Sequence, residues 1–162
     1  MLVISNHLID KMPIPYSAVI RINLAWIKDK AEAEKIIKNC KHDIYLDFPD
    51  GRKKPPVPTI TLEEAIELAK DVKYFAISNA EDIRKLSEIR RMINCELIPK
   101  IETVAGVMAI PAMIEIGIKT IMLDKEDLYT DCEQDSFIYN KLIKKVRSYD
   151  LKVLELQGVV FI

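Results

Sequence analysis

The sequence predicts a single α/β domain over residues 1–162, folded as a parallel β/α barrel of the TIM type that is incomplete, with about six strands. Segments typical of strands alternate with segments typical of helices, as in a parallel sheet. No change in composition divides the chain into two domains. Polar residues gather at the C-terminal ends of the expected strands. This favours a barrel over a doubly wound sheet, because a barrel brings those ends around one mouth.

The expected strands share an enrichment in β-branched, aromatic or other apolar residues, and the expected helices share apolar residues at helical spacing. The strands are expected at 17–26, 43–49, 72–78, 95–102, 120–124 and 151–162, and the helices at 28–40, 61–70, 79–93, 104–117 and 135–149.

Two helix starts and two loops carry local signals. Thr61 and Glu64 have the spacing of a capping box, which predicts that a helix begins there. Ser78 or Asn79 is expected to cap the helix over 79–93. The prolines of segment 49–58 predict a stiff loop. The acidic segment between 124 and 135 is expected to be a short loop.

The residues before Ser17 show no recognisable first barrel strand, which is why only six strands are expected. An open barrel would leave two unpaired edges, and such edges favour association. The sequence therefore predicts a homo-oligomer, or a partner chain that closes the barrel. Trp26, which follows the strand over 17–26, is expected to cover the core rather than to serve as a platform for a ligand.

The composition favours a small-molecule ligand. The chain has 162 residues, 49% of them hydrophobic and 30% charged, and a net charge of -1 without a long basic run, so a nucleic-acid partner is not expected. No segment has the apolar length of a membrane span, so no membrane partner is expected. Three cysteines without CxxC spacing argue against a disulfide framework or a zinc site, and a cytoplasmic location is expected.

Several enzyme classes are excluded at the level of motifs. The chain has only four glycines, and their spacing allows neither a GxGxxG nor a P-loop motif. No GxSxG motif or Ser/His/Asp pattern is present, so hydrolysis by an activated serine is not expected.

The residues that point to chemistry follow two neighbouring strands. Lys100 and Glu102 lie two apart and so on one face of a strand, and Asp127 follows the next strand. Carboxylates of Glu102 and Asp127, with Asp47 as a possible third, suit Mg²⁺ or Mn²⁺. Lys100 would neutralise an enolate, and Arg21 would grip a carboxylate or phosphate. The alternative, that these acids are solvated loop residues, stays open.

Five segments in the same order resemble the phosphoenolpyruvate/pyruvate-binding barrels, and pyruvate kinase in particular. "VIRINLAW" resembles "ARLNFSH", "IYLDFPDGRKKPP" resembles "LLDTKGPEIRT", and "YFAISNAEDIRKLSEI" resembles "FIAxSFVRxAxDVxxLR". "LIPKIETVAGV" is similar to "IxKIENxEGV", and "TIMLDKEDL" to "GIMVARGDLG". The later two segments resemble the metal-dependent oxo-acid aldolases and citrate lyase β-subunits of the same superfamily at least as well.

The resemblance implies a role for each matching residue. Arg21 would contact the phosphate or carboxylate, and Lys100 would stabilise the transition state at the enolate oxygen. Glu102 and Asp127 would hold Mg²⁺ or Mn²⁺. On the kinase model, Asn23 and Asp47 would be ligands of a monovalent cation.

The chain also departs from the kinase. Ala25 stands where the kinase has a serine ligand for the monovalent ion, so K⁺ is not favoured. Glu126 replaces a glycine and places a negative charge where the kinase binds the substrate carboxylate, and Tyr129 replaces a second glycine. The catalytic threonine, the lid domain and the C-terminal domain have no counterpart. The barrel would therefore be a truncated one.

Two functions remain open. One is a divalent-metal-dependent enzyme that stabilises the enolate of pyruvate or a related 2-oxo acid, in a lyase, aldolase or pyruvate-kinase-like transferase reaction. The other is a non-catalytic barrel that serves as a binding, regulatory or assembly module.

Overall fold

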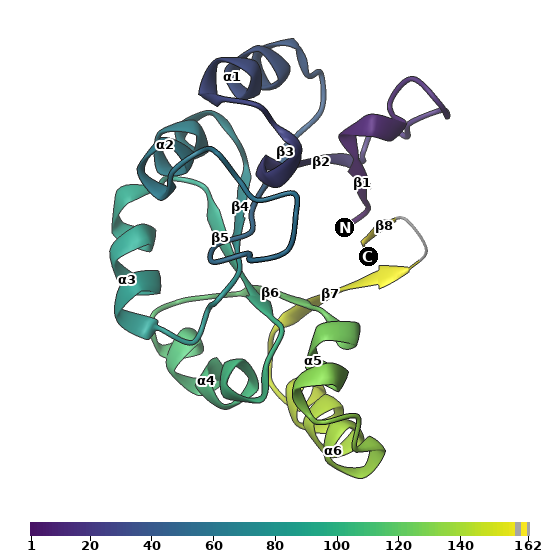
Figure 1. Cartoon of the computed structure of the whole chain (residues 1–162), viewed down its shortest axis with the longest axis vertical. Coiled ribbons are helices and arrows are strands. Elements are labelled where there is room, and N and C mark those ends of the chain that lie inside the picture. The colour runs from purple at the N-terminus through teal and green to yellow at the C-terminus, as the bar shows by residue number, and fades with distance from the viewer. Residues whose placement is uncertain (158–159, 162) are drawn as a thin grey trace.

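The computed structural model describes residues 1–157 and 160–161. In it a curved parallel sheet lies inside a layer of α-helices (Figure 1). The parallel strands are β1 (Val3–Ser5), β2 (Val19–Asn23), β3 (Ile44–Phe48), β4 (Tyr74–Ile77), β5 (Glu96–Ile101), β6 (Thr120–Leu123) and β7 (Lys152–Gln157). The helices are α1 (Lys30–Asn39), α2 (Leu62–Leu68), α3 (Ile83–Met92), α4 (Val104–Glu115), α5 (Lys125–Asp131) and α6 (Ser136–Arg147).

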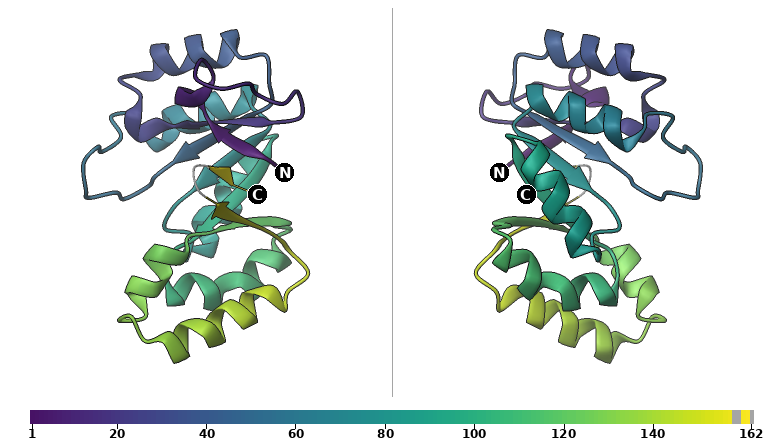
Figure 2. Two further views of the ribbon diagram at one scale, coloured as in Figure 1. Left: turned by 90° about the vertical axis from the view of Figure 1, so that its right-hand side faces the viewer. Right: turned by 90° about the vertical axis from the view of Figure 1, so that its left-hand side faces the viewer.

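The seven parallel strands pair in chain order, which is the order of a TIM-like barrel and not of a doubly wound sheet. A two-residue strand, β8 (Val160–Phe161), then pairs antiparallel with both β7 and β1 and bridges the remaining gap. The left view of Figure 2 shows β8 beside the N-terminal end of β1. The barrel thus has seven parallel strands, and a short antiparallel one stands where an eighth would lie.

The expected strand count was too low by one, because the first strand lies within the residues before Ser17. Val3, Ile4 and Ser5 pair in register with Val19, Ile20 and Arg21, and Val3 and Ile4 are buried. Three residues are too few to show the alternation by which longer strands are recognised. The two edges expected to be unpaired were the strands that became β2 and β7. In the structure β2 pairs with β1, and β8 pairs with both β7 and β1.

The segment expected as an acidic loop after β6 contains helix α5. The Asp124 carboxylate accepts a hydrogen bond from Asp127 N at 3.1 Å and caps the helix. Helix α3 is capped by Asp82 rather than by Ser78 or Asn79, because Asp82 accepts from the backbone of Arg84 and Lys85. The capping box of Thr61 and Glu64 at α2 is confirmed.

Two apolar layers form the core. The inner layer lies inside the curled sheet and takes one buried side chain from each parallel strand: Val3, Val19, Tyr45, Ala76, Ile98, Met122 and Leu154. The outer layer joins the other face of the strands to the helices and includes Leu46, Phe75 and Ile101. Since side chains alternate along a strand, the residues two positions after the inner layer face the mouth of the barrel.

No helix in the described part of the chain combines the length and the apolar character needed to cross a membrane.

Candidate functional site

A pocket of about 310 Å³ opens at the C-terminal ends of the strands. It is lined by Arg21, Asn23, Pro49, Asp50, Gly51, Arg52, Ser78, Asn79, Lys100, Glu102, Met122, Asp124 and Asp127. Ligands of β/α barrels bind at this end, where residues from several strands meet. Of the residues singled out in the sequence, the structure brings Arg21, Asn23, Lys100, Glu102 and Asp127 to this one pocket.

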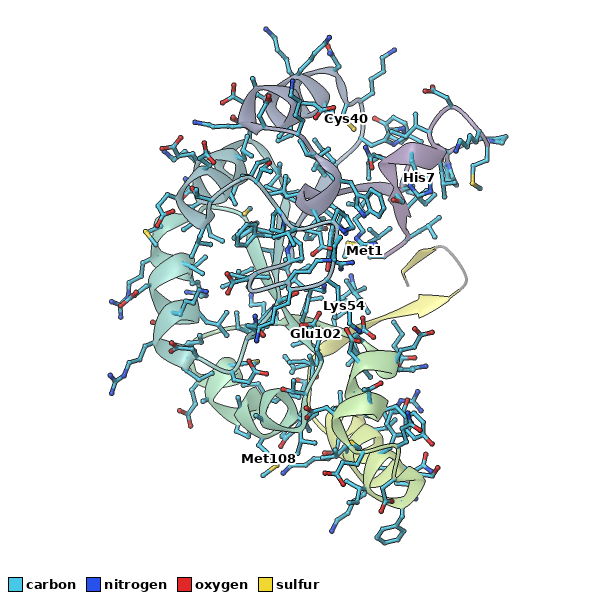
Figure 3. All side chains as sticks on the ribbon, viewed as in Figure 1. Met1, His7, Cys40, Lys54, Glu102 and Met108 are labelled. Carbon is cyan, nitrogen blue, oxygen red and sulfur yellow. The ribbon has the colours of Figure 1, made fainter. Side chains whose placement is uncertain are left out.

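Lys100 lies on β5, two residues after Ile98 of the inner layer and on the same face of the strand. Glu102 follows directly after the end of β5. Lys100 Nζ lies 3.1 Å from Glu102 Oε1 and donates a hydrogen bond to Ser78 Oγ at 3.2 Å. Ser78 Oγ in turn donates to Glu102 Oε1 at 3.1 Å. Figure 3 shows Glu102 near the centre of the ring of strands, whereas Met108 points outward from α4. Both charges therefore belong to the barrel mouth, as their spacing predicts.

Asp47 lies beneath the pocket and is 1% exposed. Its Oδ2 accepts hydrogen bonds from Arg21 Nε at 2.8 Å and from Arg21 Nη2 at 2.5 Å. Its Oδ1 lies 3.7 Å from Lys100 Nζ. A buried carboxylate needs such compensation, because an isolated buried charge is costly. Asp47 thus anchors the two cations that line the pocket above it.

Burial and neighbouring charges set the ionisation of this network. Burial alone would raise the pKa of Asp47, but Lys100 and Arg21 outweigh it, so the pKa lies below its ordinary value. Burial would lower the pKa of Lys100, but Asp47 and Glu102 more than offset this and raise it. Lys100 is therefore a cation at neutral pH.

The pKa of Glu102 is shifted in the opposite direction to that of Asp47. Burial raises the pKa of Glu102, and the nearby Asp124 adds to the effect, while Lys100 and Ser78 oppose it without cancelling it. The Glu102 carboxylate is thus incompletely compensated in the folded protein. Such a group at a ligand pocket gains most from a bound cation.

Three carboxylates at the mouth lie close enough together that they could hold a cation. One oxygen each of Glu102, Asp124 and Asp127 lies within 4.8 Å of the others. The set is made of hard oxygen donors, which suits Mg²⁺ or Mn²⁺. Sequence reasoning named Glu102 and Asp127 but not Asp124 as a ligand. The available signal was the spacing of Asp124 and Asp127, which is typical of an N-cap. In the structure Asp124 lies between β6 and α5 and caps the helix.

The structure does not bring Asp47 into this carboxylate cluster among the described residues, since its oxygens face Arg21 and Lys100. Glu126 is exposed on α5 and is not among the described residues that line the pocket. Tyr129 packs edge-to-face on Tyr139, with ring centroids 5.2 Å apart. The Asn23 side chain lines the pocket and also accepts a hydrogen bond from Ala25 N at 3.0 Å.

The loop between β3 and α2 was expected, but the sequence did not indicate that it supplies Arg52 to the pocket. Asn79, in the left-handed region with φ 51°, donates a hydrogen bond to Asp50 O at 2.6 Å and holds the loop against the end of β4. Asp50 also pairs with Lys85. The signals available were Gly51 and the prolines, which predicted a fixed loop but not its position over the mouth.

Fold and pocket together define an α/β protein with a TIM-like curled sheet and an acidic site at its strand ends. No protein-family model and no curated protein matches the chain. The fold is compatible with a TIM-like barrel, and no family match identifies a superfamily.

Proposed function

We propose that the chain is a divalent-metal-dependent enzyme that stabilises the enolate of pyruvate or a related 2-oxo acid, in an aldolase or lyase reaction or in pyruvate-kinase-like transfer. The observation that carries the proposal is the cluster of Glu102, Asp124 and Asp127 in the same pocket as the cations Lys100 and Arg21. A 2-oxo acid needs this combination, since both its carboxylate and its developing enolate oxygen are negative.

Glu102, Asp124 and Asp127 would hold Mg²⁺ or Mn²⁺, which when bound would polarise the 2-oxo group as a Lewis acid. Lys100 keeps its proton because Asp47 and Glu102 raise its pKa, so it would stabilise negative charge and not act as a base. Arg21, which Asp47 orients through two hydrogen bonds, would contact the substrate carboxylate. Asn23 is positioned to add a polar contact at the same side of the pocket.

The second candidate is a non-catalytic binding, regulatory or assembly module. The observation that favours it is the contact of 3.1 Å between Lys100 and Glu102, by which the protein balances part of its own site charge. A metal that bound Glu102 would have to compete with this ammonium group.

Metal binding is the first test. The Mn²⁺ affinity is measured by calorimetry and by the electron paramagnetic resonance of free Mn²⁺, with and without oxalate as an enolate analogue. Wild type should bind Mn²⁺ with higher affinity when oxalate is present, and Glu102→Gln or Asp127→Asn should weaken binding at least tenfold. Glu126→Gln is the matched control, because Glu126 is an exposed acid on the same helix. Equal Mn²⁺ binding by all four proteins would overturn the proposal.

Enolate formation is the second test. In D₂O with Mg²⁺, an enzyme of this kind should release a methyl proton of pyruvate to the solvent as the enolate forms and take up deuterium from the solvent as the enolate is protonated again. Proton NMR detects the loss of the methyl signal. Lys100→Met should abolish the exchange. If wild type binds Mn²⁺ and oxalate but catalyses no exchange, the binding module is the better description.

A further inference from the structure

A second pocket, of about 500 Å³, adjoins the candidate site on the side of β1 and β2. Arg21 and Asn23 line both pockets, so the two pockets lie side by side. Beyond these two residues the second pocket is lined by the 3₁₀ helix η1 (Asn6–Leu8), by the 3₁₀ helix η2 (Leu24–Trp26), and by residues at and before α1. Figure 3 shows His7 of η1 at this side of the barrel. We call this space the tail pocket.

The tail pocket has an apolar floor and wall. Trp26, Ile27 and Ile36 line it, and Trp26 is 72% exposed, although the sequence suggested that this side chain would cover the core. The two residues before it, Leu24 and Ala25, fill the core instead. The indole therefore contributes to a pocket wall rather than to the hydrophobic core.

Hydrogen bonds within the protein hold the backbone of the turn that carries Trp26. Asn23 Oδ1 accepts a hydrogen bond from Ala25 N at 3.0 Å and caps η2, the turn that carries Trp26. After the turn, Thr59 Oγ1 donates to Lys28 O at 2.6 Å. A backbone held in this way lowers the entropy lost on binding.

The charges of the tail pocket do not favour an anion at its far end. Among the described residues that line it, Arg21 is the only lysine or arginine, and it lies at the border with the candidate site. Glu32 is the acid, and its Oε2 already accepts a hydrogen bond from Lys28 N at 2.7 Å. Away from Arg21 the lining combines Trp26, Ile27 and Ile36 with the polar residues Ser5, Asn6 and His7, and it suits an uncharged, mainly apolar group.

We infer that the substrate is a 2-oxo acid with a branched aliphatic or aromatic tail, whose acid end lies at Arg21 and Lys100 and whose tail lies on Trp26 in the tail pocket. The inference rests on the proposed function and narrows its substrate class. Bare pyruvate would fill only the first pocket and leave the tail pocket to water.

The test compares pyruvate with 4-methyl-2-oxopentanoate, which differs from it by an isopropyl group on the methyl carbon. Both are titrated into Mn²⁺-loaded protein by calorimetry. The branched acid should bind at least about tenfold tighter, because each apolar carbon placed in a hydrophobic pocket is worth roughly that factor. Trp26 is the single tryptophan of the chain, so its emission should shift with the branched acid and not with pyruvate.

Substitutions of Trp26 test the tail pocket independently of the candidate site. Trp26→Ala should reduce the affinity for the branched acid to that for pyruvate and leave pyruvate unchanged, and Trp26→Phe should restore part of the difference. Phe137→Ala is the matched control, because Phe137 is an aromatic residue of α6 that is 80% exposed. It should change neither affinity.

Two failures are distinguishable. If pyruvate binds in a Mn²⁺-dependent way but the branched acid binds no tighter, or keeps its advantage in Trp26→Ala, the tail assignment is wrong and the proposed function stands. If neither acid binds with Mn²⁺, the proposed function fails and the tail assignment fails with it.

Discussion

Lys100 Nζ lies 3.1 Å from Glu102 Oε1, and the two side chains share the inner face at the end of β5. The same ammonium lies 3.7 Å from Asp47 Oδ1, so one cation stands between a structural carboxylate and a candidate metal ligand. Any divalent ion that binds Glu102 must share it with Lys100. A substitution of Lys100 should therefore change the metal affinity and the catalytic rate in opposite directions.

Lys100→Met should raise the Mn²⁺ affinity while abolishing pyruvate exchange. Removing the competing ammonium leaves Glu102 to the metal, and we expect a gain of up to about tenfold, or ~1.4 kcal/mol. Calorimetry with Mn²⁺ measures the gain, and exchange in D₂O measures the loss. Lys73→Met is the control, because Lys73 pairs with Asp43 at the surface. A lower Mn²⁺ affinity in Lys100→Met would show that Lys100 does not compete for the site.

Asp47→Asn should destabilise the fold strongly. The substitution leaves Lys100 and Arg21 partly buried without their shared carboxylate, and breaking a buried ion pair from one side costs about 3 to 5 kcal/mol. Urea unfolding at pH 7 measures the free energy of unfolding. Asp43→Asn removes an exposed partner of Lys73, and a surface pair of this kind is worth about 0 to 1 kcal/mol. Similar losses in the two variants would contradict a structural role of Asp47.

Glu102→Gln should have the opposite effect and stabilise the metal-free protein at neutral pH. The folded-state pKa of Glu102 lies above its ordinary value, mainly because of burial, so ionising this carboxyl costs the folded state free energy. Below the ordinary pKa of a glutamate the group is protonated in both states, and wild type and variant should be equally stable. As the pH rises through the folded-state pKa, wild type should lose stability relative to Glu102→Gln.

Urea unfolding in the presence of EDTA at pH 4 and pH 7 tests this prediction. Glu155→Gln is a control of opposite sign. Burial would raise the pKa of Glu155, but its pairs with Lys125 and Arg147 lower it. That variant should be less stable than wild type at pH 7, by an amount that shrinks as the pH falls. If Glu102→Gln were less stable than wild type at pH 7, the ionised Glu102 carboxylate would not be the destabilising group that its raised pKa indicates.

Gly51→Ala should weaken oxalate binding through the loop over the pocket. Gly51 has φ +65°, and an added Cβ would lie 2.3 Å from Asn79 Nδ2, so the contact that holds the loop must shift. Gly117→Ala is the control, because Gly117 has φ +86° and an alanine there costs a similar backbone strain. Its Cβ would meet only the end of the Arg90 side chain. Both variants should lose about 1 to 2 kcal/mol of stability. Calorimetry with Mn²⁺ and oxalate should show weaker binding in Gly51→Ala alone.

The longer elements were predictable because their patterns are set by local chemistry. The strands that become β2 to β7 and the capping box at Thr61 follow from apolar periodicity and side-chain hydrogen bonding within a few residues. Strand β1 was not predictable, because its three residues are held by pairing with β2 and β8, distant in sequence. Helix α5 was missed because its acidic residues suggested a loop, whereas Asp124 makes them the first turn of a helix.

For the candidate site, the sequence indicated which strand ends carry charge but not how the charges pair. Spacing alone placed Lys100 and Glu102 on one face, and the structure agrees. It could not show that Asp47 belongs to Arg21, since that pair joins residues 26 positions apart. Nor could it show that Trp26 faces outward, because the packing of Leu24 and Ala25 decides which residue of the turn enters the core.

At the end of β5, even-numbered and odd-numbered residues face opposite sides of the sheet and therefore have different neighbours. Ile98, Lys100 and Glu102 face the lumen and the mouth, whereas Leu97 and Ile101 pack in the helix layer. Selection on the chemistry of the mouth can therefore alter Lys100 and Glu102 without replacing Leu97 and Ile101, which pack against the helices. A library restricted to Lys100 and Glu102 would explore new specificities while the scaffold stays constant.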